Sequence, residues 1–312
     1  FHRLSPSRLC RRSQVPVFDA TTGEPLPVES IEAALRAICE ASPKASAPGL
    51  LSGGSAPSLA ILTTCGRDEW AQLRASLEAH APANRRSLRR IDDALFCLSL
   101  DEADLGTVGG AEPQGPQLVH AERLALCGDS RLAPRWMDKA FSLAVTADGV
   151  PTFHFEHSWG DGICVARAGG ETMMAIAKDQ LPHCTASAGG TEAAGAAGAA
   201  GAAGAAGAAA PRRLEWSVPA DMAAAVKRQD AQYAQTCRSL ELSILSFDGF
   251  GARELKGWGV SPDGAAQAAL ALAFHRLHGR MGATYESATT AAFSGGRTET
   301  IRPATAACRA WV

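Results

Sequence analysis

The feature that most limits the fold is a run of repeated Gly-Ala-Ala triplets between Thr191 and Ala210. The triplets have no large apolar side chain to bury and no charge to pair, so they cannot join a packed core. They also lack the prolines of collagen and are too few for an independent triple helix. We therefore predict a Gly/Ala linker over residues 191–211, an N-terminal domain over 1–190 and part of a second domain over 212–312.

Composition sets wider limits. The chain has 312 residues, of which 46% are hydrophobic, so it can bury the core of one large or two ordinary domains. Its 30 basic and 32 acidic residues give a net charge of −2, which lacks the basic excess that binding to nucleic acid needs. No segment reaches the roughly 20 apolar residues of a membrane-spanning helix. We expect a soluble protein without a nucleic-acid partner or a transmembrane segment.

Cysteine and histidine spacing argues against a metal. The nine cysteines are odd in number and form no Cys-x-x-Cys pair, which speaks against a zinc site, a disulfide scaffold and an oxidising compartment. His275 and His278 share a helix face but have no evident third ligand. We expect no metal and no resident cofactor.

Hydrophobic periodicity predicts alternating helices and strands. Helices are expected over residues 27–41, 84–93, 218–233 and 262–277, with Ser261 capping the last. A further helix, with Trp70, Leu73 and Leu77 on one side, is expected to run to about His80. Strands are expected over 59–62, 94–100 (buried on both faces) and 240–247, and residues 105–132 are expected to be loop. Gly169 and Gly170 are expected to interrupt a helix. The fold class that follows is α/β.

A hairpin carries the sharpest chemical signal. Strands at 141–145 and 152–155 flank Asp148-Gly149, a strong turn signal, and the second strand leads to the sequence EHSWGDG at 156–162. His157 and Asp161 fit an H-x-x-x-D-G pattern. A histidine titrates near neutral pH, so His157 can take a proton from an alcohol and return it to a leaving thiolate, while Asp161 orients the ring. The alternative is an ordinary histidine at the edge of a sheet.

Four separated blocks extend this signal. They are LTTCGRDEWAQLR (62–74), the pair RWMDKAFSL (135–143) and FHFEHSWGDG (153–162), VSPDG (260–264), and TYESATTAAFSGGRTETIRP (284–303). With these blocks in this order, the chain resembles the choline/carnitine acyltransferase family, and within it the long-chain, mitochondrial branch. The resemblance implies a two-domain CoA-dependent acyltransferase fold, like that of chloramphenicol acetyltransferase, with an incomplete second domain because the family's chains are much longer.

The resemblance also implies a function. It is transfer of a fatty acyl group, expected to be long-chain, between coenzyme A and carnitine, in fatty acid oxidation on the matrix side of the mitochondrial inner membrane. The substrates would be acyl-CoA and L-carnitine, and peripheral membrane association is left open. A peroxisomal, short-chain or choline-type transferase and a catalytically inactive fragment or binding module are the alternatives.

The same resemblance implies roles for single residues. His157 matches the catalytic base and Asp161 the acid that positions it. Tyr285, Ser287 and Thr298 match the carnitine site, and Lys256 and Asp263 match positions that contact coenzyme A. The alternatives are that Tyr285 and Thr298 are buried hydroxyls with local partners and that Lys256 is a solvated lysine. Lys256 has Gly257 and Gly259 beside it where the family has paired lysines, so we expect a weaker grip on the CoA phosphate.

Overall fold

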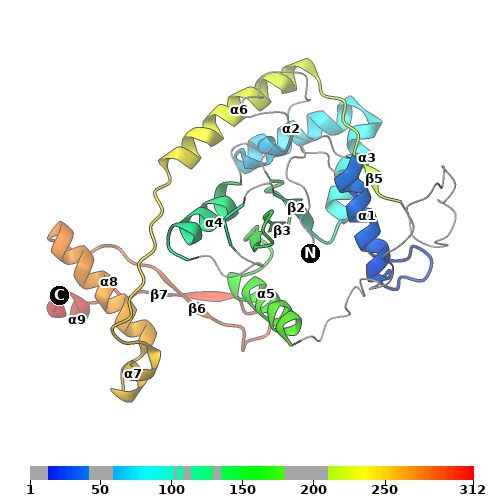
Figure 1. Ribbon diagram of the computed structural model, residues 1–312. Helices are drawn as coiled ribbons and strands as arrows, with labels where there is room; N and C mark the ends of the chain where they lie inside the picture. The colour runs from blue at the N-terminus through cyan, green and yellow to red at the C-terminus, as the bar shows by residue number, and fades with distance from the viewer. Residues whose placement is uncertain (1–12, 42–58, 102–103, 108–113, 129–134, 179–209) are drawn as a thin grey trace. The chain divides into compact units, whose positions relative to one another are not determined.

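The computed structural model divides into two units (Figure 1). Unit 1 comprises residues 1–159 and 163–242, and unit 2 comprises 160–162 and 243–312. The residues that the structure describes are 13–41, 59–101, 104–107, 114–128, 135–178 and 210–312. The predicted linker lies outside them, apart from Ala210 and Pro211. Within them the chain is a mixed α/β protein of helices and small sheets, as the periodicity indicates.

Up to residue 242 the helices of the described residues are α1 (Val28–Ala41), α2 (Arg67–His80), α3 (Pro82–Asp93), α4 (Pro116–Cys127), α5 (Gly162–Ala177) and α6 (Ala220–Ser239). Of these, α1, α2, α3 and α6 lie close to where they were predicted. The prediction of a loop over residues 105–132 is wrong at α4, which begins with Pro116 and ends at Gly128, whose φ of +71° suits glycine. The proline at the start and the glycine after the end indicate this helix more clearly than the weak hydrophobic periodicity of the residues between them.

Residues 59–62, predicted as a strand, instead belong to the 3-10 helix η1 (Leu59–Thr64). The hydroxyls of Thr63 and Thr64 each donate to the carbonyl three residues earlier, at 2.6 Å in both cases. Such local hydrogen bonds compete with strand pairing. The apolar run is nevertheless buried, because Leu62 is 0% exposed.

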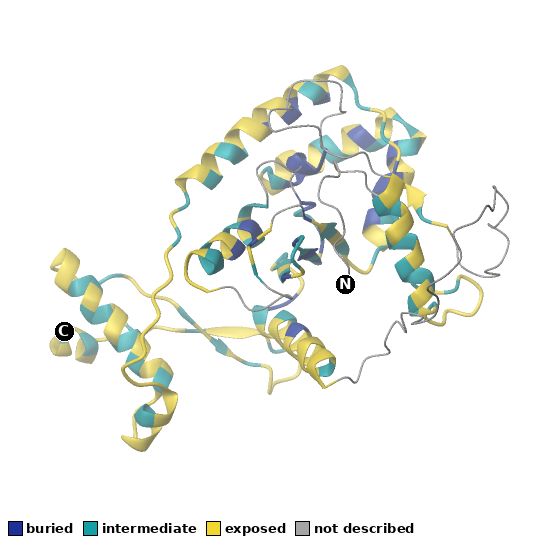
Figure 2. Cartoon of the chain, in the orientation of Figure 1, coloured by how far each residue is buried: buried dark blue, intermediate teal, exposed yellow. Residues whose placement is uncertain are grey.

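The core of unit 1 lies among η1, α2, α3 and α6, where the dark residues of Figure 2 gather. Leu77 and Leu88 are fully buried there, and Met222 of α6 is 2% exposed. Trp70 and Trp136 meet edge to face in the same cluster, with ring centroids 5.7 Å apart. By contrast, none of the residues of α1 is buried, although its amphipathic pattern predicts a face packed on a core.

The strand that precedes His157, β4, belongs to a three-stranded sheet with the strand order β2-β3-β4. β2 (Cys97–Leu100) runs parallel to β3 (Phe141–Val145), which pairs antiparallel with β4 (Pro151–Phe155) in the predicted hairpin. β2 is not buried on both faces as predicted, since its residues alternate between half-buried and exposed. A continuous apolar run therefore does not show that both faces are covered.

Residues 212–242 belong to unit 1, whereas the sequence places everything after the linker in a second domain. β5 (Arg212–Arg213) pairs with β1 (Ser13–Gln14). Asn84 of α3 then receives the backbone N–H of Ser217 at 2.8 Å and donates to the carbonyl of Ser217 at 2.7 Å. These side-chain hydrogen bonds satisfy the backbone N–H and carbonyl of Ser217, as pairing with a neighbouring strand would.

Unit 2 contains α7 (Ala252–Gly257), α8 (Pro262–His278), β6 (Glu286–Thr289), β7 (Thr298–Ile301) and α9 (Ala306–Trp311). The cap predicted for α8 is confirmed, because the Ser261 hydroxyl accepts from the N–H of Gly264 at 3.2 Å. The strand predicted over 240–247 is wrong, since these residues form no strand in the described part of the chain. None of residues 243–312 is buried within the structure.

Candidate active site

His157 lies in a turn directly after β4, at the end of the β3–β4 hairpin. Its side chain is exposed, and its ring centroid is 5.5 Å from that of Phe155, the last residue of the strand. Phe155 pairs in register with Phe141 of β3. The second strand of the hairpin therefore leads to His157 at its end, as the sequence predicts.

The far end of the hairpin is held by Asp148. Its carboxylate accepts the hydroxyls of Thr146 and Thr107, each at 2.6 Å, and the N–H groups of Thr107 and Leu105 at 2.9 and 3.2 Å. Burial alone would raise the pKa of Asp148, but these hydrogen bonds outweigh it and lower the pKa to about 2. Asp148 is therefore an ionised hydrogen-bond acceptor of the turn.

A charged network holds the segment that carries His157. The Arg67 guanidinium donates to Asp138 Oδ1 at 2.7 Å and also pairs with Glu156, the residue before His157. The Trp70 indole N–H donates to the second oxygen of Asp138 at 2.6 Å. One arginine from α2 thus joins the segment before β3 to the residue after β4.

The turn itself adds two further contacts. The Glu156 carboxylate accepts from the N–H of Ser158 at 3.1 Å and from its hydroxyl, and these hydrogen bonds, with the nearby Arg67, lower the pKa of Glu156. The Trp159 indole N–H donates to the carbonyl of Ala140 at 2.7 Å. His157 is therefore flanked on both sides by residues with defined partners.

None of the three charged residues of this network is among the site residues expected from the sequence. Arg67, Asp138 and Glu156 nevertheless stand in two of the four separated blocks that carry the family resemblance, Asp138 and Glu156 in the two halves of the paired block. The signal that could have found them is the charged residues within these blocks, because charged side chains close to a catalytic loop need partners.

Asp161 is buried and belongs to unit 2, where its Oδ1 accepts from Nη2 of Arg297 at 3.0 Å. Arg297 directly precedes Thr298 in the sequence GGRTETIRP. This pairing, which was not expected from the sequence, joins Asp161 to the block that carries the expected carnitine residues within unit 2. That Asp161 orients the ring of His157 stays a prediction.

The β6–β7 pair brings expected carnitine residues together. Thr289 pairs with Thr298 and Ser287 with Thr300, so Ser287 and Thr298 lie on the same face of this two-stranded ribbon. Tyr285 comes two residues before Ser287 and is 63% exposed. Tyr285 and Thr298 are both exposed, so the alternative that they are buried hydroxyls is wrong for unit 2 as the structure describes it.

The expected CoA residues flank the turn between α7 and α8. Lys256 lies in the last turn of α7, and Asp263 lies in the first turn of α8. The Asp263 carboxyl shares a hydrogen bond with Glu286 of β6, and this contact raises the pKa of Glu286. Asp263 is thereby placed beside the strand that carries Ser287.

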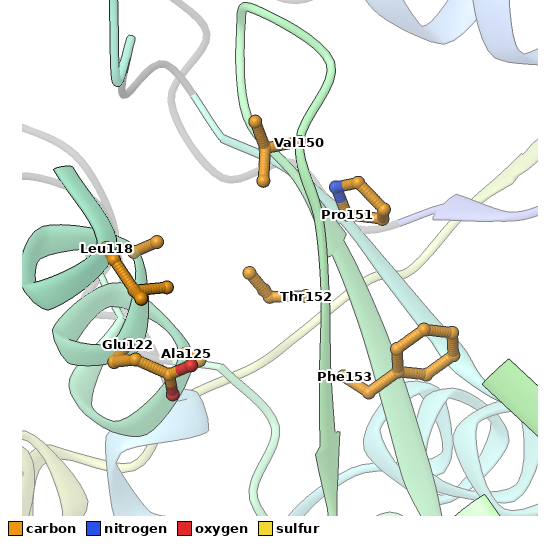
Figure 3. A pocket seen from close by; sticks show the side chains of 8 residues that line it. Leu118, Glu122, Ala125, Val150, Pro151, Thr152 and Phe153 are labelled. Atoms are coloured by element: carbon orange, nitrogen blue, oxygen red, sulfur yellow. The ribbon is translucent and has the colours of Figure 1, made fainter. Parts of the chain in front are cut away.

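A small pocket of about 240 Å³ lies in unit 1 between α4 and β4 (Figure 3). Leu118, Glu122 and Ala125 line it from the helix, and Pro151, Thr152 and Phe153 line it from the strand. Its volume is below the roughly 300–1,000 Å³ of ordinary ligand sites, so we assign no ligand to it.

The described residues show neither a metal site nor a membrane-spanning helix. Within them, no group of three or more His, Cys, Asp or Glu side chains is arranged to hold a metal ion. Within the same residues, no helix is long and apolar enough to cross a membrane.

Comparisons with known proteins show the protein family to which the chain belongs. The sequence model of the family described as Choline/Carnitine o-acyltransferase matches residues 9–312, and the chain belongs to that family. It is similar to "Carnitine O-palmitoyltransferase 2, mitochondrial" of Mus musculus, with 36% identity over 252 residues, 79% of this chain and 33% of the relative. The Homo sapiens protein of the same name is 35% identical over 246 residues, again 79% of this chain and 33% of the relative.

A second group of relatives is named for choline instead of carnitine. Choline O-acetyltransferase of Sus scrofa is 31% identical over 253 residues, which is 80% of this chain and 35% of that protein. The chain spans about a third of the length of the curated relatives it matches.

Proposed function

We propose that this chain supplies the catalytic base and parts of both substrate sites of a carnitine O-acyltransferase acting on long-chain acyl-CoA. The observation that carries the proposal is the network in which Arg67 pairs with Asp138 and Glu156 and thereby holds the segment before His157. It links residues from two of the four sequence blocks around one exposed imidazole, an arrangement suited to proton transfer.

The chemistry follows from the ability of an imidazole to accept a proton and to return it. His157 takes the proton from the carnitine hydroxyl as the oxygen attacks the thioester carbonyl carbon. The carbon–sulfur bond then breaks, and the protonated imidazole returns the proton to the departing CoA thiolate. No acyl-enzyme forms, so neither a serine nor a cysteine nucleophile is needed.

Carnitine is proposed as the acceptor because hydroxyl groups gather on one face of the β6–β7 ribbon. Ser287 and Thr298, with Tyr285 beside them, can donate to the carnitine carboxylate. The higher identity to the carnitine palmitoyltransferases than to the choline acetyltransferases supports the same choice. Lys256 and Asp263 are proposed to contact coenzyme A.

The setting is proposed from the same relatives. Their name places them in the mitochondrion, so we propose a role in mitochondrial fatty acid oxidation, on the matrix side of the inner membrane. A peroxisomal or short-chain enzyme is the alternative.

The test measures CoA release from palmitoyl-CoA with and without L-carnitine. We expect release that depends on carnitine, a decrease of about 10²–10⁴-fold in His157→Ala, and no decrease in His120→Ala, which removes an exposed histidine of α4. Repeating the assay with choline and with octanoyl-CoA tests the acceptor and the acyl length.

Either of two results would contradict the proposal. Full carnitine-dependent activity in His157→Ala would remove His157 as the base. Binding of palmitoyl-CoA without any carnitine-dependent release would favour an inactive binding module.

A further inference from the structure

Two helices that are distant in sequence meet at their C-terminal ends in unit 1. Arg123 of α4 donates to the carbonyl of Cys237 in α6 at 3.1 Å and to that of Leu240 at 2.8 Å. In return, the Tyr233 hydroxyl of α6 donates to the carbonyl of Cys127, the last residue of α4, at 3.3 Å. Three hydrogen bonds therefore hold the last turns of the two helices side by side.

This arrangement brings two free thiols together. The Cys237 thiol lies close enough to the Cys127 thiol to affect its ionisation, and both residues are half-buried. Tyr233 and Cys237 are four residues apart on α6, so they share the helix face that contacts α4. Neither thiol takes part in the proposed transfer chemistry.

Local chemistry makes Cys127 slow to react at neutral pH. Burial, together with the neighbouring Cys237, raises the pKa of the Cys127 thiol to about 11. Since the thiolate is the reactive form of cysteine, little of Cys127 is reactive near pH 7. Its reactivity should rise steeply as the pH increases.

We propose that Cys127 and Cys237 form a modification site, in which a peroxide oxidises the pair to a disulfide that thiols reduce again. One thiolate attacks a peroxide oxygen, the O–O bond breaks to give a sulfenic acid and hydroxide, and the hydroxide takes up a proton to become water. The second thiolate attacks the sulfenic sulfur, the S–S bond forms, and the departing hydroxide takes up a proton. Overall, two thiols and one hydrogen peroxide give one disulfide and two waters.

The cross-link would connect α4 to the end of α6 and close a loop on the order of 100 residues, a length at which disulfides stabilise strongly in the chain-entropy model. The hydrogen bonds from Arg123 and Tyr233 already hold the two helix ends, so the bond forms between groups that are close in the reduced protein. Oxidation should therefore strengthen an existing contact between helices.

The experiment is a peptide map of the whole chain after treatment with hydrogen peroxide at pH 8 and alkylation of the remaining thiols. Trypsin places Cys127 in the peptide 124–131 and Cys237 in 229–238, each with a single cysteine. We expect these two peptides as a linked species, two hydrogens lighter than their sum, which dithiothreitol separates. The Cys164→Ser control, which removes an exposed cysteine, should give the same linked pair.

A second measurement covers the stability of the cross-linked form. Oxidation should raise the midpoint of thermal unfolding of the wild-type chain by several degrees, and Cys237→Ser should remove this increase. Recovery of the two peptides only as separately oxidised or alkylated species, or linked to other cysteines instead, would overturn the proposal. The wild-type map decides the matter even if Cys237→Ser does not fold.

Discussion

At the scale of single residues, Arg67 has the clearest consequence for function. It contacts two carboxylates from different segments, Asp138 at 2.7 Å and Glu156, while its own side chain is 62% exposed. Exposed ion pairs add only about 0.2–1 kcal/mol to stability. Its larger effect should come from placing the segment that carries His157.

Replacing Arg67 with glutamine should therefore lower kcat by up to about 10²-fold, because small displacements of a catalytic group are costly. KM should change little, and Arg67→Lys should restore part of the activity because lysine can hold one of the two carboxylates. Steady-state kinetics with palmitoyl-CoA and carnitine checks this.

The matched control is Arg228→Gln. Arg228 forms a comparably exposed ion pair with Glu69 at 2.8 Å, but it lies on α6, away from the His157 segment in sequence. Equal losses of kcat in the two variants would show that Arg67 has no specific positioning role.

His154 presents a different case at the same scale. It lies on β4 opposite Ser142, and its Nδ1 is buried without a hydrogen-bond partner among the residues that the structure describes. Burial, and then the positive charge of Arg135, lowers the pKa of His154 below its usual value of 6.5. The folded protein therefore keeps this ring neutral.

A lowered histidine pKa makes stability depend on pH in a fixed direction. The unfolded chain binds the proton near pH 6.5 and the folded chain binds it only at lower pH, so the free energy of unfolding should decrease as pH falls below about 6.5. Urea unfolding at pH 5–8 should show a flatter profile for His154→Phe than for the wild type. An unchanged slope would assign the pH dependence to other groups.

At the scale of elements, α5 shows how a pair of glycines can be misread. The prediction that Gly169 and Gly170 interrupt the helix is wrong, because α5 runs through both. A Cβ on Gly169 would lie 3.2 Å from the Phe153 ring, whereas a Cβ on Gly170 would meet nothing within 4 Å. Gly169 thus permits close packing on β4, and Gly170 has no such constraint.

The same substitution at these two positions should have different effects. Gly170→Ala should raise the free energy of unfolding by about 0.5–1 kcal/mol, because alanine loses less entropy in a helix. Gly169→Ala should gain less, or destabilise, since the added methyl presses on the Phe153 ring. Urea titrations of both variants check this, and equal gains would show that the contact has no cost.

Other elements agree to different degrees with what their local sequence predicts. The hairpin at Asp148-Gly149 and the cap at Ser261 form as predicted, because turn and cap chemistry depends on neighbours in the sequence. η1 does not form the predicted strand, because the hydroxyls of Thr63 and Thr64 satisfy carbonyls within the same segment. A short apolar run specifies burial better than it specifies backbone shape.

At the scale of the whole molecule, the chain after the Gly/Ala tract returns to the first core. Leu214, Met222 and Val226 join the cluster that contains Leu62 and Leu77. Residues 212–242 thus pack in unit 1, although they follow the tract in the sequence.

This packing can be tested with Met222→Ala. We expect a loss of about 2–5 kcal/mol in the unfolding free energy of unit 1, similar to that for Leu77→Ala, because both side chains are buried in one core. Urea denaturation followed by tryptophan fluorescence measures it, since Trp70, Trp136 and Trp216 pack in or against this cluster. A loss below about 0.5 kcal/mol, typical of surface sites, would indicate that α6 is not part of that core.

What the sequence determined by itself was local chemistry: the mixed helix and strand content, the hairpin before His157, the cap of α8 and the family motifs. Such features depend on residues close together in the chain. Only the tertiary structure decided which distant residues pair, as in Arg67 with Glu156, Arg297 with Asp161, and Cys127 with Cys237. Periodicity and composition carry no information about which charge or thiol meets which, because that depends on how the elements pack.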